Sequence, residues 1–287
     1  MPEDVSEMRA DWDRVDGQGY ILDRNRKRRH AAASRLNLQF YLWQDTLGFN
    51  IQPTVAAALP RAAAIAEVAS GTGLWLGAVS RQRPEARCDG LDLNLGTAPP
   101  AAWLPANAQL RRWDVLGAVP DDMAGGYDFV HTRLLLFVVE AGDPRPIARN
   151  LWRLLKPGGY VQWDEAALEH TRVDKTDPGL ATPALDQLAA WLRARRHNWG
   201  TQLARFLGEE GFQDATIESF GDRPDLARAV SGANLLGVEE VAECMATLGE
   251  SETAAKYFRL IEEAHEESIA GAALCVPRVV CTARKPF

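Results

Sequence analysis

The sequence predicts an α/β fold in which helices connect the strands of a parallel sheet. Segments with strand character alternate with segments of helical periodicity between residues 62 and 164. The first strand segment runs directly into the glycine-containing turn Ser70-Gly71-Thr72-Gly73. The 287 residues, 46% of them hydrophobic, suffice for one large α/β domain or for a core domain with a smaller cap.

An amphipathic helix is predicted at 31–47, ahead of this alternation. Its apolar side chains recur at helical spacing, at Leu36, Phe40, Trp43 and Leu47. Gly48 fits the end of this helix, and Pro53 fits the start of the next one.

Five strands are predicted in the central part of the chain, at 62–68, 87–91, 109–113, 127–132 and 160–164. Helices are predicted at 74–83 and 144–155, and the turn Lys156-Pro157-Gly158-Gly159 ends the second of them.

The pattern changes after Glu165, where longer helical segments take over. We expect helix over 183–207 and over most of 238–270. Strands are expected at 213–220 and, closing the chain, at 276–283.

Composition and charge exclude several classes of protein. A net charge of −7 argues against a general nucleic-acid binder. The longest aliphatic and aromatic run, 134–139, is too short to span a bilayer, and the acidic first residues lack the apolar core of a signal peptide. Four cysteines without a CxxC motif indicate free thiols, and five dispersed histidines indicate no metal cluster. We therefore expect a cytoplasmic protein.

The glycine turn predicts a nucleotide-type ligand that lacks phosphate. Glycines after a strand let the backbone approach a ligand closely, and parallel sheets bind ligands at the carboxyl ends of their strands. A dinucleotide site requires a third glycine where Leu76 stands here, and no Gly-Lys-Ser/Thr sequence of a phosphate-binding loop occurs.

Acidic residues end three successive strands, at Glu67, Asp92 and Asp114. Asp92 could accept hydrogen bonds from both hydroxyls of a ribose. Asp114 could accept one from an adenine amino group, with Val115 beside the ring, and Glu67 could face a cationic amino-acid tail. Each could alone be an ordinary turn acid or surface carboxylate, but the recurrence at three strand ends favours an adenosine ligand.

These segments together resemble the class I S-adenosylmethionine (SAM)-dependent methyltransferases of the fungal secondary-metabolite type. That group includes the gliotoxin-cluster amide N-methyltransferase and global-regulator-type relatives. The resemblance covers roughly residues 20–285. It is carried by Arg35-Leu36-Asn37-Leu38-Gln39, Leu47-Gly48-Phe49-Asn50-Ile51-Gln52-Pro53, 67–75, Gly90-Leu91-Asp92, Trp113-Asp114-Val115, 127–133 and 154–163.

The resemblance implies a Rossmann-like fold with a seven-stranded, mostly parallel sheet, flanking helices and a helical cap. It divides the chain into an N-terminal cap segment (1–55), a SAM-binding core (56–165) and a cap insertion followed by the final strands (166–287).

SAM as cofactor is also implied by the resemblance, with a set of contacting residues. These are Tyr20, Glu67, Ala69, Gly71, Asp92, Leu93, Asp114, Val115, and Thr132 or Arg133. The chain departs from the Asp-x-Gly-x-Gly-x-Gly form of the family at Ala69, which replaces the first glycine. A methyl group is small, so we expect the cofactor to bind nonetheless.

Catalytic residues can be few, because alignment alone lowers the barrier of a methyl transfer substantially. A general base would help an oxygen, thiol or amide acceptor. Glu165 is the first candidate, followed by His197 and His131. A satisfied histidine in the helix layer is the more ordinary role for His131, and a solvated helix face is the alternative for His197. The predicted substrate-binding residues are Trp163, Asp164 and Trp199.

The sequence therefore predicts a SAM-dependent methyltransferase that acts on N, O or S of a small secondary metabolite, with nitrogen weakly preferred. Two alternatives stay open. One is an enzyme of the same fold that catalyses a SAM-assisted cyclisation or pericyclic step, and the other is a non-enzymatic regulatory partner. The expected partner is a small natural-product substrate rather than nucleic acid or membrane, and a homodimer is allowed.

Overall fold

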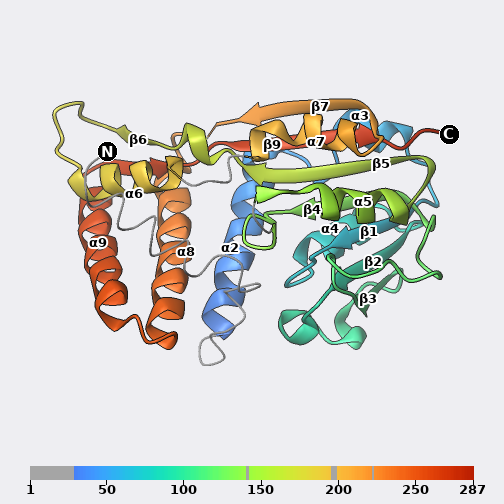
Figure 1. Cartoon of the computed structure of the whole chain (residues 1–287), viewed down its shortest axis with the longest axis horizontal. Helices are drawn as coiled ribbons and strands as arrows, with labels where there is room; N and C mark the ends of the chain where they lie inside the picture. The colour runs from blue at the N-terminus through green and yellow to red at the C-terminus, as the bar shows by residue number, and fades with distance from the viewer. Residues whose placement is uncertain (1–28, 140–141, 195–198, 222) are drawn as a thin grey trace.

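A computed structural model describes residues 29–139, 142–194, 199–221 and 223–287. A seven-stranded sheet, of strand order β3-β2-β1-β4-β5-β9-β7, forms its centre (Figure 1). The strands are β1 (Ala64–Val68), β2 (Arg87–Asp92), β3 (Ala108–Arg112), β4 (Tyr127–Arg133), β5 (Leu155–Ala166), β7 (Gln213–Phe220) and β9 (Arg278–Arg284).

The first five of these strands are parallel, and β9 pairs antiparallel with both β5 and β7. The predicted α/β fold with a seven-stranded, mostly parallel sheet is therefore confirmed. Strand order reverses beside β1, and the ends of β1, β2 and β4 meet there at one edge of the sheet. Ligands of open α/β sheets bind at such a reversal.

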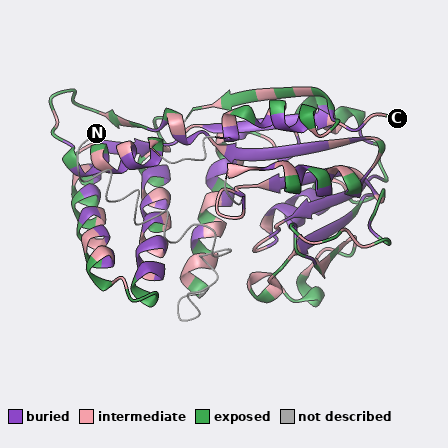
Figure 2. Ribbon diagram, in the orientation of Figure 1, coloured by how far each residue is buried: buried purple, intermediate pink, exposed green. Residues whose placement is uncertain are grey.

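Helices cover both faces of the sheet. On one face lie α3 (Pro53–Ala58) and α4 (Leu74–Gln82), whose apolar side chains pack against Ile65 and Phe129. On the other face lie α5 (Arg145–Leu154) and α7 (Leu203–Glu209), packed against Val68 and Trp163. Figure 2 shows the central strands β1, β2, β4 and β9 as mostly buried, as expected for a sheet covered on both sides, whereas the edge strands β3 and β7 are half-buried or exposed.

Connections between β2 and β3 contain only the short 3-10 turns η2 (Leu95–Thr97) and η3 (Ala101–Trp103), as the two adjacent prolines suggest. Two further 3-10 turns are η5 (Leu168–His170) and η6 (Gly200–Gln202).

A second group of helices forms a cap beside the sheet. It consists of α6 (Pro183–Arg193), α8 (Ala227–Thr247) and α9 (Ser251–Ile269), with a two-stranded antiparallel sheet of β6 (Arg172–Lys175) and β8 (Ala272–Cys275). Their apolar faces share one core. Figure 1 shows α2 (Arg29–Leu47) between this cap and the sheet.

Helix α2 contacts α8 of the cap through both apolar packing and an ion pair. Leu42 packs against Val230 and Ala233 of α8. The buried guanidinium of Arg35 donates to the carboxylate of Glu240, also on α8, with N–O distances of 2.5 and 2.9 Å. The segment boundaries at residues 55 and 165 stay a prediction.

Three details of the cap differ from the expected elements. The helix expected over 183–207 ends at Arg193, and α7 begins only at Leu203. Between them, Gly200 lies so close to β5 that an added Cβ would stand 2.8 Å from the carbonyl oxygen of Ala166. The helical stretch 238–270 is two helices, separated at Gly249, whose φ of +91° no continuous helix adopts. The pairing of β6 with β8 was not predicted.

The four cysteines all lie in the described part of the chain, buried and free, as expected. Within that part, no helix combines the length and the apolar character needed to cross a bilayer.

Candidate functional site

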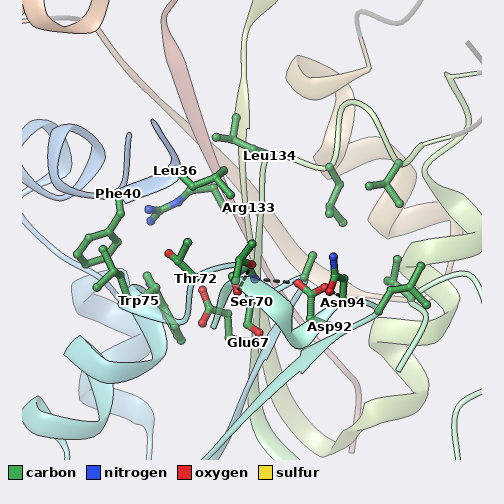
Figure 3. A pocket seen from close by; sticks show the side chains of 18 of the residues that line it. Leu36, Phe40, Glu67, Ser70, Thr72, Trp75, Asp92, Asn94, Arg133 and Leu134 are labelled. Carbon is green, nitrogen blue, oxygen red and sulfur yellow. Dashed lines mark hydrogen bonds between the residues drawn. The ribbon is translucent and has the colours of Figure 1, made fainter. Parts of the chain in front are cut away.

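A cavity of about 330 Å³ lies at the carboxyl edge of the parallel strands, where the strand order reverses. Its volume falls within the range of small-molecule sites. Figure 3 shows Phe40 and Trp75 at one end, Asp92 and Asn94 at the other, and Glu67 and Ser70 between them.

The floor of the cavity is the turn between β1 and α4. Gly71 (φ +53°) and Gly73 (φ +70°) adopt left-handed conformations that favour glycine. Ala69, which replaces the first glycine of the family pattern, has a φ of +56°. It is one of three non-glycine residues with a positive φ in the described part of the chain. The turn therefore keeps its shape with an alanine at a position where glycine would be less strained.

Asp92 is built into this turn. Its Oδ2 accepts a hydrogen bond from the backbone N–H of Gly71, and its Oδ1 accepts one from Asn94, each at 2.8 Å. Carboxylate oxygens have further lone pairs, so the group can still accept from a ligand. At the end of β3, Asp114 is exposed and its Oδ1 accepts from the N–H of Leu116 at 3.0 Å, with Val115 buried beside it.

Glu67 lies under the first turn of α4. Its Oε2 accepts a hydrogen bond from the backbone N–H of Leu76 at 3.0 Å. Burial raises the pKa of Glu67 to about 8, although the charge of Arg133 and the Leu76 hydrogen bond act in the opposite direction. At neutral pH this carboxyl therefore retains its proton until a cation arrives beside it.

Beyond Glu67, a buried charge cluster lies between β4 and β5. The carboxylate of Asp164 receives hydrogen bonds from Arg133 (2.8 and 3.1 Å), His131 (3.1 Å) and Gln162 (2.9 Å). Burial alone would raise the pKa of Asp164, but the charge of Arg133 and the hydrogen bonds from Arg133 and His131 hold it below its ordinary value. Burial is the main cause that lowers the pKa of His131. The cluster thus holds an ionised aspartate and a neutral histidine.

The cavity unites most of the residues predicted for the cofactor. Its lining includes Glu67, Ala69, Gly71, Asp92, Leu93, Asp114, Val115 and Arg133. Thr132 is buried on the other face of the sheet, where its hydroxyl donates to the carbonyl of Val68. Tyr20 lies outside the described residues.

The predicted catalytic residues lie in different places. His131 lines the cavity. Glu165 is fully buried away from it, with its carboxylate accepting from the N–H groups of Leu135 and Ala166, and burial raises its pKa to about 8. His197 lies outside the described residues.

The predicted substrate residues are also not brought to the cavity wall. Trp163 and Trp199 pack edge to face, with ring centroids 5.4 Å apart, inside the core under α5 and α7. Asp164 lies behind His131 and Arg133 in the charge cluster. The assignment of all these residues to a substrate or a reaction stays a prediction.

Several residues of the wall were not predicted as site residues. They are mainly on α2 and after β4, and they include Arg35, Gln39, Phe40, Trp75 and Leu134. The amphipathic pattern of α2 predicts that it packs on something, but the position of that helix over the turn depends on tertiary contacts. Trp75 lies two residues after Gly73, and this position was the available signal.

The chain resembles known methyltransferases both in sequence and in fold. The chain is 39% identical to methyltransferase grgD of Penicillium sp over 109 residues, 35% of this chain and 38% of that protein. It is 29% identical to N-methyltransferase gliN of Aspergillus fumigatus over 155 residues, 53% of this chain and 52% of that protein. The chain thus matches about two-fifths to one half of the length of these relatives. No family model matches the sequence.

Among solved structures, phosphoethanolamine N-methyltransferase 2 of Haemonchus contortus superposes with a TM-score of 0.51. That structure contains phosphomonomethylethanolamine and S-adenosylhomocysteine, is 15% identical in sequence, and aligns over 93% of this chain and 60% of its own. The fold is that of the Rossmann-like methyltransferases. The predicted resemblance to fungal methyltransferases is confirmed by the sequence matches.

Proposed function

We propose that this chain is a SAM-dependent methyltransferase, with SAM bound in the cavity on the 69–73 turn. One observation carries the proposal: a single cavity of suitable size brings together the glycine turn and the two strand-end acids Asp92 and Asp114. Its similarity to fungal methyltransferases supports the same activity.

The residues present fit the chemical groups of SAM. Asp92 offers carboxylate oxygens to the ribose hydroxyls, and Asp114 offers an acceptor to the adenine amino group. Val115 and Leu93 supply apolar surface for the adenine ring. Glu67 and Arg133 provide opposite charges for the zwitterionic amino-acid end. The charge pattern of the cavity thus matches a cationic ligand without phosphate.

SAM supplies an activated methyl group on its sulfonium sulfur, which is an excellent leaving group. The task of the protein is to orient the acceptor and to exclude water, which can contribute several kcal/mol to the acceleration. Helix α2 is placed for this task, because Leu36 and Phe40 cover the cavity from the cap side.

The substrate we propose is a small secondary metabolite with a nitrogen, oxygen or sulfur acceptor, nitrogen being preferred. Acidic net charge supports a small molecule over nucleic acid. Free buried cysteines support a reducing compartment, the cytoplasm. We also propose that the chain acts without a membrane partner, and that self-association as a homodimer is compatible with this activity.

The test is mass spectrometry of reactions that contain the protein, SAM and a panel of cyclic dipeptides and related metabolites. A product heavier by one methyl group, formed together with S-adenosylhomocysteine, is the expected result. A rearranged product of unchanged mass, with SAM intact, would contradict methyl transfer and favour the cyclisation alternative. Stable stoichiometric protein partners in a pull-down, without any binding of SAM, would favour a regulatory role.

A further inference from the structure

His131 lies next to Glu67 on the same face of the sheet. The two residues are register partners on the adjacent parallel strands β1 and β4, and both line the cavity. The indole of Trp75 stacks on the His131 ring, with centroids 4.0 Å apart and an interplanar angle of 6°. The ring is therefore fixed in position, with its edges left for hydrogen bonds.

The partner of one ring nitrogen fixes the tautomer. Nε2 of His131 lies 3.1 Å from Oδ2 of Asp164, and the two Arg133 bonds to the same oxygen keep this carboxylate ionised. An ionised carboxylate only accepts hydrogen bonds. The proton of the neutral imidazole must therefore be on Nε2, and Nδ1 carries a lone pair.

That lone pair has no hydrogen-bond partner among the described residues. Nδ1 of His131 is buried without one, although the residue belongs to the cavity wall. Buried acceptors are nearly always satisfied in folded proteins, because an unmade hydrogen bond is costly once the atom has left water. Because His131 belongs to the cavity wall, a donor on a bound ligand can supply the hydrogen bond that this buried acceptor lacks.

The arrangement of charges indicates which part of the ligand supplies this donor. Asp92 lies at one end of the cavity and Trp75 at the other, with Glu67 between them (Figure 3). If the ribose lies at Asp92, the amino-acid end extends towards Glu67 and His131. A cationic donor suits this end, because the neighbouring Glu67 carboxyl can become an anion beside it.

We propose that Nδ1 of His131 accepts a hydrogen bond from the α-ammonium group of SAM, in the tautomer that Asp164 sets. The proposal rests on the proposed function, since it assigns a role to His131 in binding the same cofactor. His131 is then a cofactor-binding residue rather than a general base.

Two substitutions of His131 test the roles of its two ring nitrogens separately. His131→Gln can keep an N–H towards Asp164 but removes the acceptor at Nδ1. His131→Asn can place an amide oxygen near the position of Nδ1 but no longer reaches Asp164. Two probes separate the parts of the ligand: S-adenosylhomocysteine carries the ammonium group, and 5′-methylthioadenosine lacks the whole amino-acid end. Binding of each probe to each folded variant is measured by titration calorimetry.

We expect His131→Gln to bind S-adenosylhomocysteine about 10-fold more weakly, the effect of losing one hydrogen bond to a charged group. The same variant should bind 5′-methylthioadenosine as the unsubstituted protein does. His131→Asn should recover part of the lost affinity for S-adenosylhomocysteine. Equal weakening of both probes, or no weakening of either, would overturn the proposal.

Two further readings complete the test. In the free protein, nitrogen-15 NMR should show Nδ1 of His131 as the unprotonated nitrogen, with the signal assigned by its loss in His131→Gln. A protonated Nδ1 would contradict the proposal. If His131→Gln leaves the affinity for S-adenosylhomocysteine unchanged but slows turnover, His131 receives the proton of the acceptor and the proposal is wrong. If the unsubstituted protein binds neither probe, the proposed function itself fails.

Discussion

Asp92 is held in place by the turn that it helps to form. The Gly71 and Asn94 backbone N–H groups fix both of its oxygens at 2.8 Å before any ligand is present. A preorganised acceptor loses little conformational entropy on binding. Asp114 is exposed and accepts one backbone hydrogen bond through Oδ1 at 3.0 Å. Asp92 is therefore the strand-end acid whose loss should matter most.

Asp92→Asn should weaken the binding of S-adenosylhomocysteine about 10-fold or more, because the ribose loses charge-assisted hydrogen bonds. Asp122→Asn is the matched control, since Asp122 is an exposed partner of Arg111 and does not line the cavity. Titration calorimetry of both variants measures the effect. Equal affinities would exclude Asp92 from the ribose site.

At the scale of the element, strand alternation decides which predicted residues reach the cavity. Side chains of a strand point alternately to its two faces. Glu67, His131 and Asp164 therefore share the α4 face, whereas Thr132, Trp163 and Glu165 lie on the opposite face. The sequence predicted the carboxyl ends of β1 to β4 to within one residue, whereas β5 extends beyond the expected 160–164 on both sides. The alternation could also have separated these two groups. Which face carries the cavity depends on where α2 and α4 pack, and that is a tertiary property.

Lys285 stabilises the end of α5 in a way the sequence did not reveal. Its Nζ donates to the carbonyls of Trp152 and Leu155, at 2.9 and 2.7 Å, and lies 3.7 Å from the centre of the Trp152 ring. These carbonyls would otherwise lack partners at the helix end. The residue that follows β9 thus ties the end of the chain to the end of α5.

Lys285→Met should lower the free energy of unfolding by about 1–3 kcal/mol, because two hydrogen bonds from a charged donor are lost. Lys156→Met is the control and should cost less than about 1 kcal/mol, since its ion pair with Asp128 is half exposed. Urea unfolding of both variants measures these values. A larger loss for Lys156→Met would contradict the importance of the Lys285 contact.

For the whole molecule, the sheet could be predicted from the sequence more fully than the cap. The strand β1 is a short apolar run that leads into the glycine turn, and β2 ends at Asp92, so local patterns define them. The cap depends on distant pairings, such as β6 with β8 and Arg35 with Glu240. No local pattern encodes those contacts. Part of the cavity lining could be predicted for the same reason, because Asp92 and Asp114 lie at or just after strand ends. Their role towards a cofactor stays a prediction.

Two buried carboxyls make the stability of the fold depend on pH. The pKa values of Glu67 and Glu165 are both raised to about 8, in each case mainly by burial. Between their ordinary pKa of 4.5 and 8, the unfolded chain loses these protons while the folded protein keeps them. The free energy of unfolding should therefore fall as the pH rises from about 5 to 8, by at most about 1.4 kcal/mol per pH unit for each carboxyl.

The double variant Glu67→Gln/Glu165→Gln should lose most of this pH dependence, because glutamine does not titrate. Urea unfolding at several pH values between 5 and 8 compares it with the unsubstituted protein. Equal slopes for the two proteins would show that neither carboxyl is protonated in the folded state.

Binding of S-adenosylhomocysteine to the unsubstituted chain, measured by titration calorimetry, tests the central claim most directly. We predict one site per chain with a dissociation constant below about 1 mM. We also predict proton release on binding at pH 7, seen as a dependence of the heat on the buffer, because the ammonium group of the ligand favours the ionised form of Glu67. Saturable binding with these features supports a SAM site on the 69–73 turn. Absence of any binding heat at about 1 mM ligand in several buffers would contradict it.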